Sequence, residues 1–258
     1  MLRQLRLFLT AVQFFTRLPA PAWVGHSAQQ LEQAARYLPL VGMLVGAIAA
    51  AVLYLSAQVL PLSLAVGLSM VAGILVTGAF HEDGLSDFAD GFGGGHTKEK
   101  MLAIMKDSRV GAYGVIALVL ALLLKFEALL ALCSEHSLMF TASVLIAAHA
   151  VSRLMAVSIM LTQQYVRDDD SARARPAAQL SHTSFAIALI TAAAALDFLF
   201  VASPHPWAVP VAVAAALLMR IYLAWRLRQR LGGYTGDCLG AVQQLCELAF
   251  YLGLLSVI

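Results

Sequence analysis

The chain has 258 residues, of which 60% are hydrophobic and only 12% are charged, and its formal net charge is +2. Soluble domains carry about 25% charged residues, so this composition excludes an ordinary soluble protein. The three cysteines, Cys133, Cys238 and Cys246, lack the spacing of a disulfide framework or a zinc site, and neither is expected.

The N-terminal segment, residues 1–37, begins with basic residues followed by an apolar stretch, as a secretory signal peptide does. Arg17 interrupts that stretch, however, and residues 19–23 make a poor small-residue cleavage site. We therefore expect a retained amphipathic or half-inserted helix on the cytoplasmic side.

Seven stretches are long and apolar enough to cross a bilayer, which takes about 20 residues. They are residues 38–60, 62–80, 111–132, 138–161, 184–203, 207–225 and 239–258. Only Pro61 separates the first two, so counts of six or eight are alternatives. The sequence predicts an all-α, polytopic transmembrane helix bundle of about seven spans, forming one integral-membrane domain over residues 1–258.

The Lys and Arg residues outside the predicted spans fall into four segments on one side of the membrane. These are Arg3, Arg6, Arg17 and Arg36; Lys98, Lys100, Lys106 and Arg109; Arg167, Arg173 and Arg175; and Arg226, Arg228 and Arg230. The other three loops contain no Lys or Arg. By the positive-inside rule the N-terminus is cytoplasmic and the C-terminus external, and a site in these segments would face the cytoplasm.

An acidic segment, residues 81–110, follows the second predicted span. Asp83, Asp87 and Asp90 are spaced i, i+4, i+7, which places them on one face of a helix. Like charges so placed repel unless they share a cation, and their hard oxygen atoms suit Mg²⁺ or Mn²⁺ for phosphate chemistry. The alternative is a solvated linker. His81 is a candidate general base, metal ligand or helix-end residue.

The residues after the acidic helix suit an anionic ligand. A glycine run that includes Gly93 and Gly94 allows close backbone approach. Lys106 and Arg109 suit a phosphate group, while Asp107 is either a further metal ligand or the residue that orients Arg109.

A glycine-rich cytoplasmic loop, residues 226–238, leads into the last span. Around Thr235 and Asp237 it predicts a tight turn whose backbone N–H groups contact phosphate at a helix start, although Asp237 as a simple helix cap is the alternative. Glu247 lies inside the apolar run, where a carboxylate is either functional or held by an interhelical hydrogen bond. Arg153, four residues after His149, is a candidate fixed cation for a phosphorylated substrate.

Five stretches carry a resemblance that covers nearly the whole chain. They are residues 15–19 (FTRLP), 39–42 (PLVG), 81–94 (HEDGLSDFADGFGG), 103–114 (AIMKDSRVGAYG) and 232–240 (GGYTGDCLG) with Glu247. In these stretches the chain resembles cobalamin synthase, the adenosylcobinamide-GDP ribazoletransferase family. Ser86, Phe88 and Glu82 depart from the family pattern, but no carboxylate is lost.

The resemblance implies that a hydroxyl of α-ribazole, or of its 5′-phosphate, attacks the corrinoid-side phosphorus of adenosylcobinamide-GDP and expels GMP, with a divalent cation, usually Mg²⁺. The metal candidates are Asp83, Asp87, Asp90, Asp107 and Glu247. The catalytic candidates are Asp237, His81, Lys106 and Arg109. The substrate-binding candidates are Arg17, Gly93, Gly94, Ser108, Arg153 and Thr235. Besides the lipid bilayer, a homo-oligomer and contacts with other cobalamin-pathway enzymes are expected, and nucleic acid is not.

Two other classes compete with this interpretation. A CDP-alcohol phosphotransferase also gathers aspartates at a helix edge, but it needs an Ala-Arg pair soon after its first Asp-Gly, and here Leu85 and Ser86 follow Gly84. A corrinoid or cation transporter would line a midplane site with broken helices and show paired repeats, whereas this acidic cluster lies at one membrane edge.

Overall fold

A computed structural model describes residues 2–25, 27–167 and 180–258, and this part of the chain is helical, apart from one isolated β-bridge. The predicted topology markers Arg173 and Arg175 lie outside the described residues. The helices are α1 (Leu2–Phe15), η1 (Ala22–Val24), α2 (Ala28–Ala34), η2 (Ala35–Tyr37), α3 (Leu38–Ser56), α4 (Leu62–Thr77), α5 (Phe80–Gly94), α6 (Lys98–Lys106), α7 (Ala112–Glu135), α8 (Leu138–Thr162), α9 (His182–Ala202), α10 (Ala208–Arg230) and α11 (Gly236–Leu255).

Among the described residues, six helices are long and apolar enough to cross a membrane: the run Gln29–Ser56 that contains α3, and α7, α8, α9, α10 and α11. The shorter α4 passes the same test only together with α5, from which it is separated by a bend of 87°, and that pair raises the count to seven. The predicted all-α transmembrane bundle of about seven spans is therefore confirmed.

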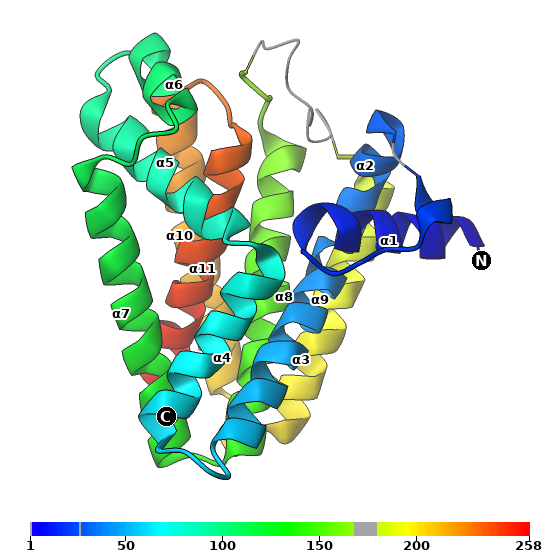
Figure 1. The fold of residues 1–258 in the computed structure, drawn as a ribbon, viewed down its shortest axis with the longest axis vertical. Helices are drawn as coiled ribbons and strands as arrows, with labels where there is room; N and C mark the ends of the chain where they lie inside the picture. Colours follow the sequence, from blue (N-terminus) through cyan, green and yellow to red (C-terminus); the bar gives the residue numbers. More distant parts are fainter. Residues whose placement is uncertain (1, 26, 168–179) are drawn as a thin grey trace.

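The bend between α4 and α5 comes from two consecutive residues in the left-handed region. Gly78 has φ 66° and Ala79 has φ 58°, a conformation that a residue with a Cβ rarely adopts. The backbone N–H of Arg17 donates to the carbonyl of Val76 at 2.7 Å and ties the end of α1 to this bend. The predicted span at residues 62–80 therefore ends at Thr77, and α5 turns out of the span across the end of the bundle (Figure 1).

The bundle is built around α8, which is mostly buried, while α7, α9 and α10 expose most of their side chains to the surroundings. Because lipid is as apolar as these side chains, packing inside the membrane depends on close contact of small residues. Gly42 and Gly46 supply that contact on α3, since a Cβ on Gly46 would lie 2.8 Å from the Ile146 Cα of α8. Figure 1 shows α5, α6 and the start of α11 gathered at one end of the bundle.

The contact between α3 and α8 predicts that Gly46→Ala lowers stability. The new methyl group would meet the backbone at Leu145 and Ile146, and overpacking of this kind costs about 1–3 kcal/mol. The matched control is Gly67→Ala on α4, where a Cβ meets nothing within 4 Å. Denaturant unfolding of the detergent-solubilised protein measures both variants, and equal stabilities would contradict the packing account.

Candidate functional site

The candidate site forms where α5 crosses α11 with their backbones in contact. A Cβ on Gly84 would lie 3.0 Å from the carbonyl oxygen of Asp237 and 3.2 Å from the Cα of Gly240. A Cβ on Gly240 would in turn lie 3.0 Å from the carbonyl oxygen of His81. Because neither glycine carries a side chain, the acidic helix α5 lies directly against the first turn of α11.

This crossing brings two carboxylates of α5, Asp83 and Asp87, close to Asp237 of α11, which is far from them in sequence. Partial burial, followed by the charges of Asp237 and Asp83, raises the pKa of Asp87 from its ordinary value to about 7. The cluster is therefore electrostatically strained when all three groups are ionised, and a cation would relieve that strain. Among the described residues, no group of three or more Asp, Glu, His or Cys side chains is placed so that it could hold a metal ion.

Asp90 does not join this cluster, although its spacing predicts that it lies on the same face of the helix as Asp83 and Asp87. Its Oδ2 accepts a hydrogen bond from the Gly111 N–H at 2.7 Å, and its Oδ1 accepts one from the Gly114 N–H at 2.9 Å. A Cβ on Gly114 would lie 2.5 Å from the Asp90 carboxylate, so the glycine makes this approach feasible. Asp90, which the sequence predicted as a metal ligand, therefore caps the start of α7.

Arg167 is a site residue whose position in the sequence indicates only the membrane topology. Its Nη2 lies 3.1 Å from the Asp237 Oδ2 and 3.4 Å from the Met105 carbonyl oxygen. A short parallel bridge positions it, since Tyr234 N–H donates to Gln164 O at 2.9 Å and Val166 N–H donates to Tyr234 O at 3.0 Å. Because this pairing joins segments about 70 residues apart, no local sequence pattern predicts it.

The predicted phosphate-binding residues around α6 lie at the exposed surface near this cluster. Lys106 lines a groove together with Lys98 and Arg167. Arg109 instead forms an exposed ion pair with Asp107 at 2.6 Å, and the hydrogen bonds from Arg109 lower the pKa of Asp107. Of the two roles predicted for Asp107, the structure shows the one in which it orients Arg109.

The remaining substrate candidates are scattered around the same end of the bundle. Ser108 and Gly94 are exposed, Gly93 lies against the ring of Tyr113, and Arg17 lies against Gly78 at the bend. Thr235 is the N-cap of α11, where its Oγ1 accepts the Cys238 N–H at 3.4 Å.

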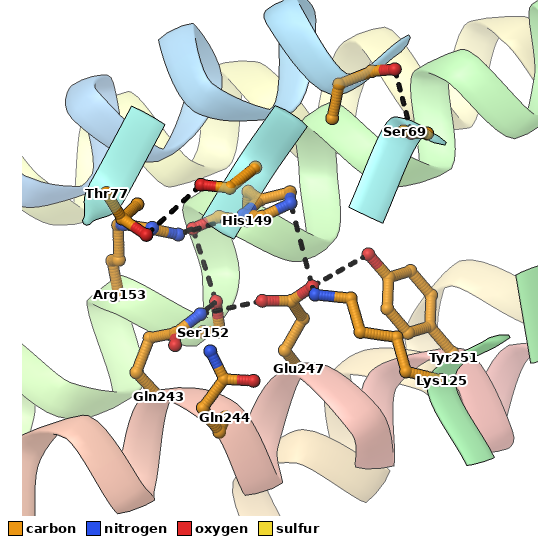
Figure 2. Close-up of polar contacts among 12 residues, drawn as sticks. Ser69, Thr77, Lys125, His149, Ser152, Arg153, Gln243, Gln244, Glu247 and Tyr251 are labelled. Atoms are coloured by element: carbon orange, nitrogen blue, oxygen red, sulfur yellow. Dashed lines mark hydrogen bonds and ion pairs between the residues drawn. The ribbon is translucent and has the colours of Figure 1, made fainter. Parts of the chain in front are cut away.

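Glu247 lies about 15 Å further along α11 than Asp237, at 1.5 Å per residue, and belongs to a separate buried network. Figure 2 shows its carboxylate among side chains of α7, α8 and α11. It contacts Lys125 Nζ at 2.5 Å, Gln243 Nε2 at 2.7 Å and Tyr251 OH at 3.0 Å. These three donors engage both oxygens, so the structure favours the structural alternative for Glu247 over the predicted metal role.

Arg153 and His81 lie between this network and the carboxylate cluster. Arg153 is 2% exposed, and its Nη1 donates to the His149 carbonyl oxygen at 3.0 Å. Its Nε is buried without a hydrogen-bond partner in the described part of the chain. Both residues line a small polar cavity with Lys125 and Glu82, and both also reach a second, apolar pocket.

The fold and this site together define a polytopic helical membrane protein with an acidic centre at one end of its bundle. The family described as Cobalamin-5-phosphate synthase matches residues 7–255 of the chain. The chain therefore belongs to that family, and the resemblance inferred from the sequence motifs is confirmed.

Two relatives illustrate how complete the similarity is. An adenosylcobinamide-GDP ribazoletransferase of Shewanella frigidimarina is 48% identical over 256 residues, which cover 99% of this chain and 96% of the relative. A protein of the same name from Leptothrix cholodnii is 47% identical over 257 residues, covering 99% of this chain and 97% of the relative. No solved structure gives a significant match. Neither relative is a CDP-alcohol phosphotransferase or a transporter.

The contacts of Asp90 predict that Asp90→Ala destabilises the protein without changing its response to Mg²⁺. The substitution leaves the N–H groups of half-buried Gly111 and buried Gly114 without an acceptor, and an unsatisfied buried group costs about 1–3 kcal/mol. Thermal unfolding with and without Mg²⁺ measures both effects. A variant of normal stability that no longer responds to Mg²⁺ would restore Asp90 as a metal ligand.

The Glu247 network predicts strong coupling between Glu247 and Lys125. Lys125→Met leaves the buried Glu247 carboxylate without its cation, and Glu247→Leu leaves the half-buried Lys125 ammonium without its anion. Breaking a buried ion pair in this way costs about 3–5 kcal/mol. The double variant carries neither charge and should therefore be more stable than either single variant. A double-mutant cycle of unfolding free energies measures the coupling, and additive losses would contradict the ion pair.

Proposed function

We propose that this chain joins adenosylcobinamide-GDP to α-ribazole or α-ribazole 5′-phosphate, releasing GMP and completing the nucleotide loop of cobalamin. The observation that carries the proposal is the convergence of Asp83, Asp87 and Asp237 at the Gly84–Gly240 crossing, in a chain similar over its full length to named ribazoletransferases. A carboxylate cluster beside Arg167 and Lys106 supplies both signs of charge that a diphosphate reaction requires.

The residues present fit a Mg²⁺ ion that the substrate helps to hold, with Mn²⁺ as a substitute. Mg²⁺ is usually bound by one or two carboxylates together with waters and substrate phosphate oxygens, and not by a complete protein cage. Burial and the charges of Asp237 and Asp83 raise the pKa of Asp87, and these three carboxylates would contribute one or two ligands once substrate phosphate oxygens are present. When bound, the ion would neutralise the charge of the diphosphate.

The side chains at the crossing suggest how transfer proceeds. The ribazole hydroxyl oxygen forms a bond to the corrinoid-side phosphorus, while the bridging P–O bond breaks and its electron pair leaves with GMP. Asp237, held by Arg167 at 3.1 Å, would accept the hydroxyl proton or serve as a ligand of the metal ion. Arg167 and Lys106 line the groove on the side where GMP would leave, and they stabilise its phosphate.

We place this site at the cytoplasmic face of the bacterial inner membrane, with the N-terminus on the same side. In support, α1, α6 and the end of α10 carry the basic residues predicted to be cytoplasmic, and α6 and the end of α10 lie at the same end of the bundle as the carboxylates (Figure 1). A homo-oligomer and association with other cobalamin-pathway enzymes stay predictions.

The metal assignment predicts that Asp83→Asn and Asp87→Asn each reduce GMP release by about 100-fold or more, because the diphosphate loses charge neutralisation. Purified protein in nanodiscs, assayed with adenosylcobinamide-GDP and α-ribazole over a Mg²⁺ titration, measures this loss, and EDTA should abolish turnover of the wild type. The matched control is Asp197→Asn, an exposed position on α9.

A second readout separates loss of the metal from loss of the fold. Without Mg²⁺, Asp87→Asn should unfold at a higher temperature than the wild type, because it removes repulsion from Asp83 and Asp237. Normal turnover in both aspartate variants, with an unchanged Mg²⁺ requirement, would remove the assignment.

A further inference from the structure

An apolar pocket adjoins the carboxylate cluster and is not used by the diphosphate chemistry. Its volume is about 140 Å³. The walls come from α1, α2, η2, α3, α5, α8, α11 and the segment that follows α8. The apolar side chains include Phe14, Phe15, Phe80, Ala156, Met160 and Leu239.

Three phenylalanines give one side of the pocket an aromatic character. The ring centroids of Phe14 and Phe15 are 4.8 Å apart, and Phe80 lies 6.0 Å from Phe14 and 5.8 Å from Phe15, all in edge-on geometry. Aromatic edges and faces of this kind favour a flat aromatic ligand beyond the simple burial of apolar area. The pocket therefore suits a planar ring better than a sugar or a phosphate.

The pocket also has a defined polar end, which lies at the reactive groups. Gly236 and Gly240 form part of its wall on either side of Asp237, and Arg167, the ion-pair partner of Asp237, contributes to the same wall. A ligand whose ring occupies the apolar part can thus present a hydroxyl group to Asp237. Arg153 and His81 line the pocket as well, and they offer buried nitrogen groups to polar atoms of the same ligand.

The two substrates of the proposed reaction differ in the surface that each requires. The guanosine diphosphate part is anionic, and the groove lined by Lys98, Lys106 and Arg167 supplies the cations for it. The ribazole base is an uncharged two-ring aromatic system that gains most from an apolar enclosure. Only the acceptor nucleoside matches both the chemistry of the pocket and its position beside Asp237.

We propose that this pocket binds the aromatic base of the acceptor nucleoside and holds its ribose at Asp237. An apolar cavity of about 150 Å³ accommodates a benzene ring, so one ring fits within the walls and the second extends toward the polar end. The proposal rests on the proposed function, and it assigns acceptor specificity to Ala156, Met160 and the three phenylalanines.

Ala156→Leu tests the proposal, because the larger side chain on α8 would occupy part of the pocket. The matched control is Ala194→Leu, at an exposed position of α9. The KM values for α-ribazole and for adenosylcobinamide-GDP are measured separately in nanodiscs. We expect the KM for α-ribazole to rise about 10-fold or more, because an apolar pocket discriminates strongly by size. The KM for adenosylcobinamide-GDP should stay within about two-fold of the wild-type value, as should both KM values of the control.

A change of base separates pocket filling from general distortion. Ala156→Leu should impair the dimethylbenzimidazole nucleoside more than the unsubstituted benzimidazole nucleoside, since only the larger base meets the added side chain. Phe14→Leu, on the N-terminal helix α1, tests the aromatic wall with a variant outside the central bundle and should weaken α-ribazole binding several-fold.

Equal changes in the two KM values, or equal effects on both bases, would overturn the proposal. A phospholipid acyl chain retained in the pocket, with α-ribazole affinity unaffected by Ala156→Leu, would overturn it as well. Absence of GMP release by the wild type would instead contradict the proposed function. Titration of the protein with α-ribazole alone, followed by fluorescence of the base, still tests the pocket in that case.

Discussion

The contact between the backbones of α5 and α11 at Gly84 and Gly240 is the constraint on which the site depends. It sets Asp83 and Asp87 beside Asp237, where partial burial, followed by the charges of Asp237 and Asp83, raises the pKa of Asp87 to about 7. Larger residues at the crossing would separate the helices and relax this repulsion. Under the proposed function, this cluster would bind a cation together with the diphosphate of the substrate.

The rest of the bundle holds this crossing in place, and the cost of burying charge in a lipid bilayer limits how it can do so. Charges inside the bilayer are expensive unless they are paired, and Glu247 meets this requirement with Lys125, Gln243 and Tyr251 (Figure 2). The left-handed pair Gly78 and Ala79 then turns α5 out of the span and across α11. One buried ion pair and one bend thus fix the two helices that carry the carboxylates.

The sequence predicted the parts of this arrangement that local patterns encode. Apolar length gave the spans, and the helical spacing of Asp83 and Asp87 gave the acidic face. The same spacing included Asp90, which instead caps α7 because Gly111 and Gly114 leave room for its carboxylate. Arg167 could not be found, since a β-bridge between distant segments positions it. The ion-pair partner of Glu247 comes from α7, and no local pattern specifies the packing of α7 against α11.

The central claim is that the carboxylates at the crossing and the substrate diphosphate share one divalent ion. Electron–nuclear double resonance on Mn²⁺-substituted protein, with adenosylcobinamide-GDP bound and the acceptor omitted, tests it most directly. The account predicts ³¹P coupling to the bound Mn²⁺ in the wild type, and loss of that coupling when Gly240 is replaced by valine and the helices are separated. Bound Mn²⁺ without ³¹P coupling, or coupling that survives Gly240→Val, would contradict it.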